Sequence, residues 1–136
     1  AWDLWIGVAP MRPYVNDTYA PFKWRGFRDF GCGALGDMAC HNWDIAFWAL
    51  DLGSPEWAEA SSTPFSDTIA PKTTHLVYQF PARGKRPPVK VTWMDGGLMP
   101  ARPPGPKSSA ARSWYRPQSP WLMILSGAPA ISSTSP

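Results

Sequence analysis

A stretch that begins near residue 33 carries the signals that start, continue and stop a long helix, and it limits the folds open to this chain. We expect a helix from Ala34 to Leu50, because Gly53 favours a left-handed cap and Pro55 cannot continue the helix. The side chains expected on its buried sides are apolar: Met38, Trp43, Ile45, Ala46, Phe47, Ala49 and Leu50.

Two side chains on this helix have the spacing of an acid–base pair. Asp37 and His41 lie four residues apart, one turn apart on the same face, and Asp44 follows three residues later. A carboxylate beside an imidazole fixes the orientation of the ring and raises its basicity, as a general base requires. An Asp-x-x-x-His pair on a helix is more often a structural hydrogen bond, so spacing alone leaves both interpretations open.

Glycines and cysteines surround the start of the helix. Gly31, Gly33 and Gly36 would let a planar ligand lie close to the helix N-terminus. Cys32 and Cys40 are eight residues apart, about 10–12 Å between Cα atoms on a mostly helical segment, so we expect no disulfide between them. We expect no metal site, because no second Cys/His pair is available to complete a set of ligands.

Three segments after the helix predict β-strands. Residues 57–61 give a weak signal, whereas residues 73–80 and 89–94 alternate between two faces, and we expect His75 to be structural. The proline-rich connection 81–88 predicts a turn between two antiparallel strands. The fold class expected is α+β, with one long helix and antiparallel strands. The side chains expected on shared faces are Thr74, Leu76, Tyr78 and Phe80 in one strand, and Val89, Val91 and Trp93 in the other.

The composition bears on the partners of the chain. Its 136 residues include nine tryptophans and 17 prolines, and they carry a formal net charge of only +3. The basic residues are scattered, so we expect no nucleic-acid partner. No apolar run is long enough to cross a bilayer, so we expect no membrane partner. The chain begins with Ala1 rather than Met, and it therefore predicts no cellular location.

The last part of the chain differs from the rest. Every acidic residue lies at or before Asp95, and the sequence after Pro100 is mainly Pro, Ser, Ala and Gly without a strand or helix period. We expect residues 105–136 to be a Pro/Ser-rich tail that is poorly ordered or non-native, as a reading-frame shift or a partial gene would produce. Residues 1–104 then form a partial domain, and the apolar run 121–125 is an aggregation hazard.

Several motifs occur together in a recognisable order over roughly residues 2–104. With them, the chain resembles the Gfo/Idh/MocA oxidoreductases, and most closely the bacterial-type C-terminal substrate domain of that family. The motifs are Trp2-Asp3-Leu4-Trp5-Ile6-Gly7, Arg12-Pro13-Tyr14, Phe22-Lys23-Trp24-Arg25-Gly26, Gly33-Ala34-Leu35-Gly36-Asp37-Met38, Phe80-Pro81-Ala82-Arg83-Gly84 and Trp93-Met94-Asp95-Gly96-Gly97.

The resemblance implies a two-domain parent protein. An N-terminal Rossmann domain would bind NAD or NADP, and an α+β domain with a large antiparallel sheet would hold much of the substrate pocket. Subunits would meet through that sheet, which implies a homo-oligomer. The chain looks like the front part of the second domain, since no G-x-G-x-x-G follows a strand and the Glu-Lys-Pro motif of the family is missing. The cofactor would then be bound mainly by a domain absent from this chain.

The resemblance also implies roles for particular residues. Asp37 and His41 match an aspartate and a histidine that lie beside the nicotinamide in the family. His41 would take the hydroxyl proton of a sugar or polyol while hydride leaves the adjacent carbon, and Asp37 would orient or share that proton. The residues expected to contact the substrate are Trp24, Arg25 and Asp44.

The function expected from these observations is that of a fragment of an NAD(P)-dependent oxidoreductase with a carbohydrate-like substrate, inactive without the Rossmann domain. Two alternatives remain open. The tryptophan density also suits a non-catalytic domain for carbohydrate binding or assembly, in which rings stack on sugars. Some relatives in the superfamily are glycosidases that use NAD in a cycle of oxidation, elimination and reduction.

Overall fold

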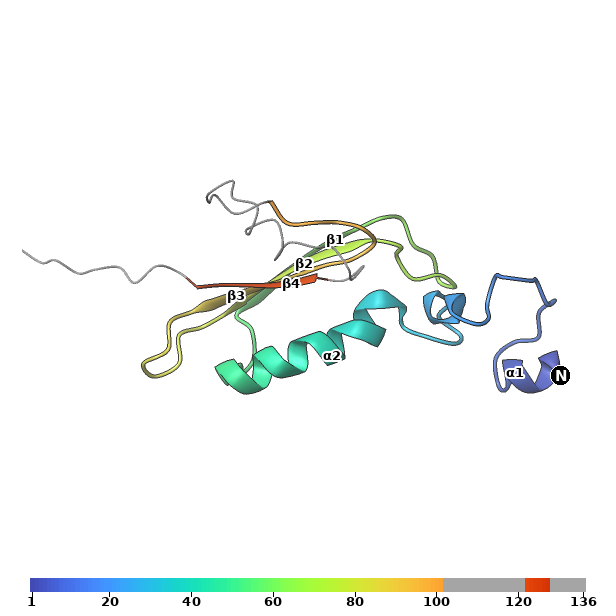
Figure 1. The fold of residues 1–136 in the computed structure, drawn as a ribbon, viewed down its shortest axis with the longest axis horizontal. Coiled ribbons are helices and arrows are strands. Elements are labelled where there is room, and N and C mark those ends of the chain that lie inside the picture. The colour runs from blue at the N-terminus through green and yellow to red at the C-terminus, as the bar shows by residue number, and fades with distance from the viewer. Residues whose placement is uncertain (102–121, 128–136) are drawn as a thin grey trace, which may run out of the picture.

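The computed structural model describes residues 1–101 and the backbone of the strand at residues 122–127 (Figure 1). Two helices and a short 3₁₀ turn precede a sheet of four strands. In chain order the elements are α1 (Trp2–Ile6), η1 (Lys23–Gly26), α2 (Gly33–Leu50), β1 (Trp57–Ser62), β2 (Thr74–Phe80), β3 (Val89–Met94) and β4 (Leu122–Gly127). Within the described residues, no helix is long and apolar enough to span a membrane.

The four strands form one antiparallel sheet in the order β1-β2-β3-β4. Tyr78 of β2 lies opposite Val91 of β3, so the predicted hairpin of these two strands is confirmed. Within the described residues, β1 has a neighbouring strand on one side only, and all six of its side chains are exposed. The helix and the antiparallel sheet together confirm the α+β fold class.

Helix α2 lies along one face of the sheet (Figure 1). The alternation of β2 and β3 turns their apolar side chains toward this helix, and Trp93, Val91 and Phe80 are completely buried there. Trp43 of α2 packs against both halves of the core and meets Tyr78 edge-on at 4.8 Å between ring centroids. The core therefore forms where one stripe of the helix meets one face of the sheet.

The buried stripe of α2 differs from the prediction at three positions. Ala39 and Ala46 are buried, whereas Ile45 is 69% exposed and Ala49 and Phe47 are also exposed. Residues one apart on a helix point about 100° away from each other, so a helix that turns Ala46 to the sheet turns Ile45 aside. Ile45 and Ala49 lie off the stripe, so their predicted burial was wrong. Phe47 lies at its edge, where it is 37% exposed although its ring meets the buried Phe80 edge-on at 5.6 Å between centroids.

The end of α2 also differs in detail. The helix ends at Leu50, as predicted, but the left-handed residue is Asp51, with φ 54° and ψ 52°, and not Gly53. The backbone N–H groups of Asp51 and Leu52 both donate to the carbonyl oxygen of Phe47. This earlier cap turns Leu52 into the core, where it is buried.

A buried carboxylate fastens one end of the β2–β3 hairpin. Asp95 has no exposed surface, and it accepts hydrogen bonds from the backbone N–H of Thr74, from the Thr74 hydroxyl at 2.6 Å and from the Trp93 indole N–H at 2.9 Å. Three donors satisfy the charge of this side chain inside the protein. This role of Asp95 was not predicted, because in the sequence Asp95 follows a strand among turn residues.

The first thirty residues form an aromatic cluster around the short helix α1, where the sequence analysis gave no helix. Tyr19 is buried among the rings of this cluster, and the Arg12 guanidinium lies 5.1 Å from the ring centroid of Phe30. Arg12 also forms an ion pair with Asp29, and this hydrogen bond raises the pKa of Arg12 above its ordinary value. The other rings in the cluster are those of Trp2, Trp5, Tyr14 and Phe27.

Strand β4 falls in the part of the chain where no strand was expected. It pairs with β3 in an antiparallel register, with Leu125 opposite Val91. The remaining tail residues lie outside the part that the structure describes, so the expectation of a poorly ordered or non-native tail stays a prediction.

Candidate active site

The five site residues predicted from the sequence lie on two elements. Asp37, His41 and Asp44 lie on α2, and Trp24 and Arg25 lie on η1. Figure 1 shows η1 next to the N-terminal end of α2, the end that carries Asp37. The arrangement therefore brings Arg25 to the acidic side chain of the predicted pair.

Backbone contacts hold η1 in this position. The Gly26 carbonyl oxygen accepts a hydrogen bond from the Ala70 N–H at 2.9 Å, and the Arg28 N–H donates to the Thr68 carbonyl at 2.9 Å. Gly31 allows the chain to pass close to Arg25, because a Cβ atom at Gly31 would lie 2.6 Å from the Arg25 Cα. A side chain at Gly31 would therefore push η1 away from the helix.

An ion pair joins the two elements. The Arg25 Nε donates to the Asp37 Oδ2 at 2.6 Å, and both side chains are about three-quarters buried. The other carboxylate oxygen of Asp37, Oδ1, accepts no hydrogen bond from the described residues. Asp37 thus presents one oxygen that Arg25 holds and one that is available to a ligand.

The guanidinium of Arg25 is also held by its own element. Its carbon lies 4.0 Å from the ring centroid of Phe22 and 4.7 Å from that of Trp24, distances typical of cation–π contacts. Its Nη1 donates to the Phe22 carbonyl oxygen at 2.8 Å. Phe22 was not predicted as a site residue, and the signal for it was its place two residues before Trp24 in the aromatic motif.

His41 stands apart from this network. Its side chain is exposed on α2 and makes no hydrogen bond or ion pair with any residue that the structure describes. Asp37 is bonded to Arg25 and not to His41, although the two residues lie one turn apart as predicted. Asp44 is likewise exposed and unbonded within the described chain. The carboxylate–imidazole contact expected from the spacing is therefore absent from this conformation.

The glycines at the start of α2 allow close contacts within the protein itself. Gly31, Gly33 and Gly36 have the G-x-G-x-x-G spacing of dinucleotide-binding loops, but they follow a turn and not a strand. A Cβ atom on Gly33, whose φ is +73°, would lie 2.7 Å from the Ala70 Cβ, and one on Gly36 would collide with Cys32. These glycines are therefore required by close contacts within the protein, and the planar ligand stays a prediction.

The thiols and acids near α2 do not gather into a metal centre. Cys32 and Cys40 are both free and exposed, and the Cys40 thiol donates to the Asp37 carbonyl oxygen at 3.3 Å. Over residues 1–101, no group of three or more His, Cys, Asp or Glu side chains is arranged to hold a metal ion.

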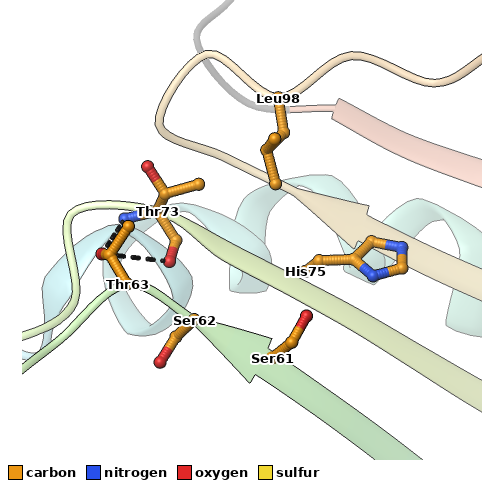
Figure 2. Close-up of a pocket in the computed structure, with 6 residues that line it drawn as sticks. All are labelled: Ser61, Ser62, Thr63, Thr73, His75 and Leu98. Carbon is orange, nitrogen blue, oxygen red and sulfur yellow. Dashed lines mark hydrogen bonds between the residues drawn. The ribbon is translucent and has the colours of Figure 1, made fainter.

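The second histidine of the chain lies on the other face of the sheet. His75 lines a hollow of about 240 Å³ (Figure 2). Ser61 lies directly opposite it on β1, and the Thr63 hydroxyl is already occupied by the N–H groups of Lys72 and Thr73. Because strand residues alternate between faces, His75 points away from α2 and from Asp37.

One comparison with known proteins bears on this arrangement. A Gfo/Idh/MocA family model, described as "Oxidoreductase family, C-terminal alpha/beta domain", matches residues 1–69, which include α1, η1, α2, β1 and all five predicted site residues. No curated protein matches the sequence. Since the matched segment is half of the chain and contains the whole candidate site, the chain belongs to the C-terminal domain of the Gfo/Idh/MocA oxidoreductase family.

Proposed function

We propose that this domain supplies the proton-transferring and substrate-orienting side chains of an NAD(P)-dependent oxidoreductase that acts on a sugar or polyol. The observation that carries the proposal is the exposed imidazole of His41, which bonds to none of the described residues and lies one helical turn from a carboxylate that is held in place. A general base must be accessible to the substrate, and its acceptor nitrogen must not be hydrogen-bonded within the protein.

The chemistry available to this chain is proton transfer. As a carbinol is oxidised, its O–H bond breaks and the proton passes to the free ring nitrogen of His41, while a C=O double bond forms. A nicotinamide, when bound, supplies the acceptor for the hydride that leaves the same carbon. His41 returns the proton in the reverse direction, so one side chain serves both directions of the reaction.

Asp37 has a separate task in this proposal. Its Oδ1 is free of hydrogen bonds within the described residues, so it can accept one from a substrate hydroxyl or from the His41 ring. Either contact would fix the angle at which the carbinol meets the imidazole. Trp24 lies against Arg25 on η1, and Asp44 follows His41 by three residues on α2; we propose both as substrate contacts.

Among the described residues, the glycines do not form the loop on which a dinucleotide is usually bound. The three glycines with dinucleotide-like spacing pack against Arg25, Ala70 and Cys32, which leaves no cradle for a pyrophosphate. We therefore propose that a separate domain holds NAD or NADP, and that this chain is inactive alone.

The two histidines of the chain provide a matched test of this proposal. In the complete enzyme, His41→Ala should lower kcat by about 10²- to 10⁴-fold, the usual loss for a general base. His75→Ala removes the same side chain from the opposite face of the sheet and should leave kcat unchanged. Steady-state kinetics with a sugar alcohol and NAD or NADP measure both. Full turnover in the His41→Ala enzyme would contradict the proposal.

A further inference from the structure

We propose that Arg25 is a positioning residue, which holds the Asp37 carboxylate in place and does not grip the substrate. The inference rests on the proposed function, because it assigns the part that Arg25 takes in the same site. It changes the expected role of this residue from substrate contact to support.

The contacts around Arg25 are directed toward the protein itself. Its Nε is bonded to Asp37 at 2.6 Å, and its Nη1 is bonded to the Phe22 carbonyl at 2.8 Å. The rings of Phe22 and Trp24 lie against the guanidinium carbon. A planar, rigid donor that is held from several sides keeps its partner in one orientation without further ordering.

The pairing of charges in the site also favours a supporting role for Arg25. The positive charge of Arg25 is paired with the negative charge of Asp37 within the protein. An anionic substrate group at this position would meet a carboxylate 2.6 Å from the Arg25 Nε, and the repulsion would offset the attraction. The pair therefore suits a neutral substrate with hydroxyl groups better than a sugar acid.

The backbone next to the Arg25–Asp37 ion pair also favours this supporting role. Gly31 passes so close to Arg25 that it cannot carry a side chain, and the Ala70 N–H is bonded to the carbonyl oxygen of the next residue, Gly26. These contacts fix η1 relative to α2 before any ligand arrives. Asp37 is thus pre-oriented, which is what a group that aligns a reacting hydroxyl requires.

Kinetics of the complete enzyme test the inference with a neutral polyol and its acid analogue as substrates. Arg25→Ala should lower kcat for the polyol by about 10- to 100-fold, as expected for a misplaced aligning group, with KM changed by less than about twofold. The double variant Arg25→Ala/Asp37→Asn should be no slower than Asp37→Asn alone, because both changes remove the same function, which is the oriented Asp37 carboxylate. Arg28→Ala is the control, since Arg28 is exposed and bonded to the Ser66 carbonyl, and it should leave kcat unchanged.

Chemical rescue separates positioning from general damage to the fold. Free methylguanidinium should occupy the space between the rings of Phe22 and Trp24 in the Arg25→Ala enzyme and restore part of kcat. Lysine lacks the planar fork of arginine, so Arg25→Lys should recover less. The inference is overturned if Arg25→Ala raises KM for the acid substrate alone, if kcat does not change, or if methylguanidinium restores nothing.

A spectroscopic measurement on this 136-residue chain tests the ion pair independently of activity. The side-chain Nε–H signal of Arg25 should shift and exchange faster with water in the Asp37→Asn variant, while that of Arg28 should not change. An Arg25 signal that is unaffected would overturn the inference. Full activity in the His41→Ala enzyme would instead overturn the proposed function. The Arg25 Nε–H signal would then still show whether the Arg25–Asp37 ion pair forms.

Discussion

At the scale of single residues, Asp95 illustrates how one buried polar group can decide the stability of a hairpin. Its carboxylate receives one backbone and two side-chain donors from Thr74 and Trp93, at the end where β2 begins and β3 ends. None of these donors is open to water, so each one depends on the aspartate for its hydrogen bond.

The loss of this carboxylate should therefore destabilise the domain strongly. Asp95→Ala leaves three buried donors without a partner, and at about 1–3 kcal/mol for each the free energy of unfolding should fall by about 3 kcal/mol or more. Asp67→Ala, at an exposed loop position, should change it by less than about 0.5 kcal/mol. Urea unfolding followed by tryptophan fluorescence measures both variants. Equal midpoints would show that Asp95 has no such role.

The candidate site shows what spacing along the chain can and cannot predict at this scale. The four-residue interval correctly placed Asp37 and His41 one turn apart on a helix. It did not predict that Arg25, twelve residues earlier on another element, would take the carboxylate. A local pattern reports which side chains share a face, whereas the choice of partner depends on how η1 folds back.

At the scale of elements, the sequence predicts the buried faces of the two central strands more clearly than the buried face of α2. The period of two in β2 and β3 was read correctly because one face is apolar and core-facing. Helix α2 has apolar side chains on most of its circumference, including Trp48, which is 86% exposed. Such a helix gives no clear stripe, so Ile45 was assigned to the wrong side.

Two tryptophans on α2 allow a direct test of which side of the helix faces the core. Trp43→Ala should lower the free energy of unfolding by about 3 kcal/mol, because the ring packs against both core clusters. Trp48→Ala makes the same chemical change on the exposed side and should cost less than about 0.5 kcal/mol. Thermal or urea unfolding compares them, and similar losses would mean that α2 is rotated from the position described.

At the scale of the whole molecule, the chain belongs to the C-terminal domain of its family, and in its described part the G-x-G-x-x-G spacing follows a turn and not a strand. We expect this sequence to show no saturable binding of NADH or NADPH at micromolar concentrations, because its glycines serve close contacts with Arg25, Ala70 and Cys32. Nicotinamide fluorescence during titration measures this. Micromolar binding by the chain alone would contradict the proposal that a separate domain holds the cofactor.

The sheet also limits what can be read from the sequence at this scale. Strands β1, β2 and β3 carry local signals, but β4 pairs with β3 from a part of the chain without a strand period. Pairing to an existing strand supplies backbone hydrogen bonds whatever the side chains are. A strand added in this way leaves little trace in a single sequence.

The one-sided pairing of β1 has a consequence for how the chain behaves in solution. No strand among the described residues pairs with its outer row of N–H and C=O groups, and such an edge can pair with a strand of another molecule. Glu59, in the middle of this strand, places a negative charge there, and like charges from successive copies would repel one another. This exposed carboxylate would therefore disfavour the pairing of two copies edge to edge.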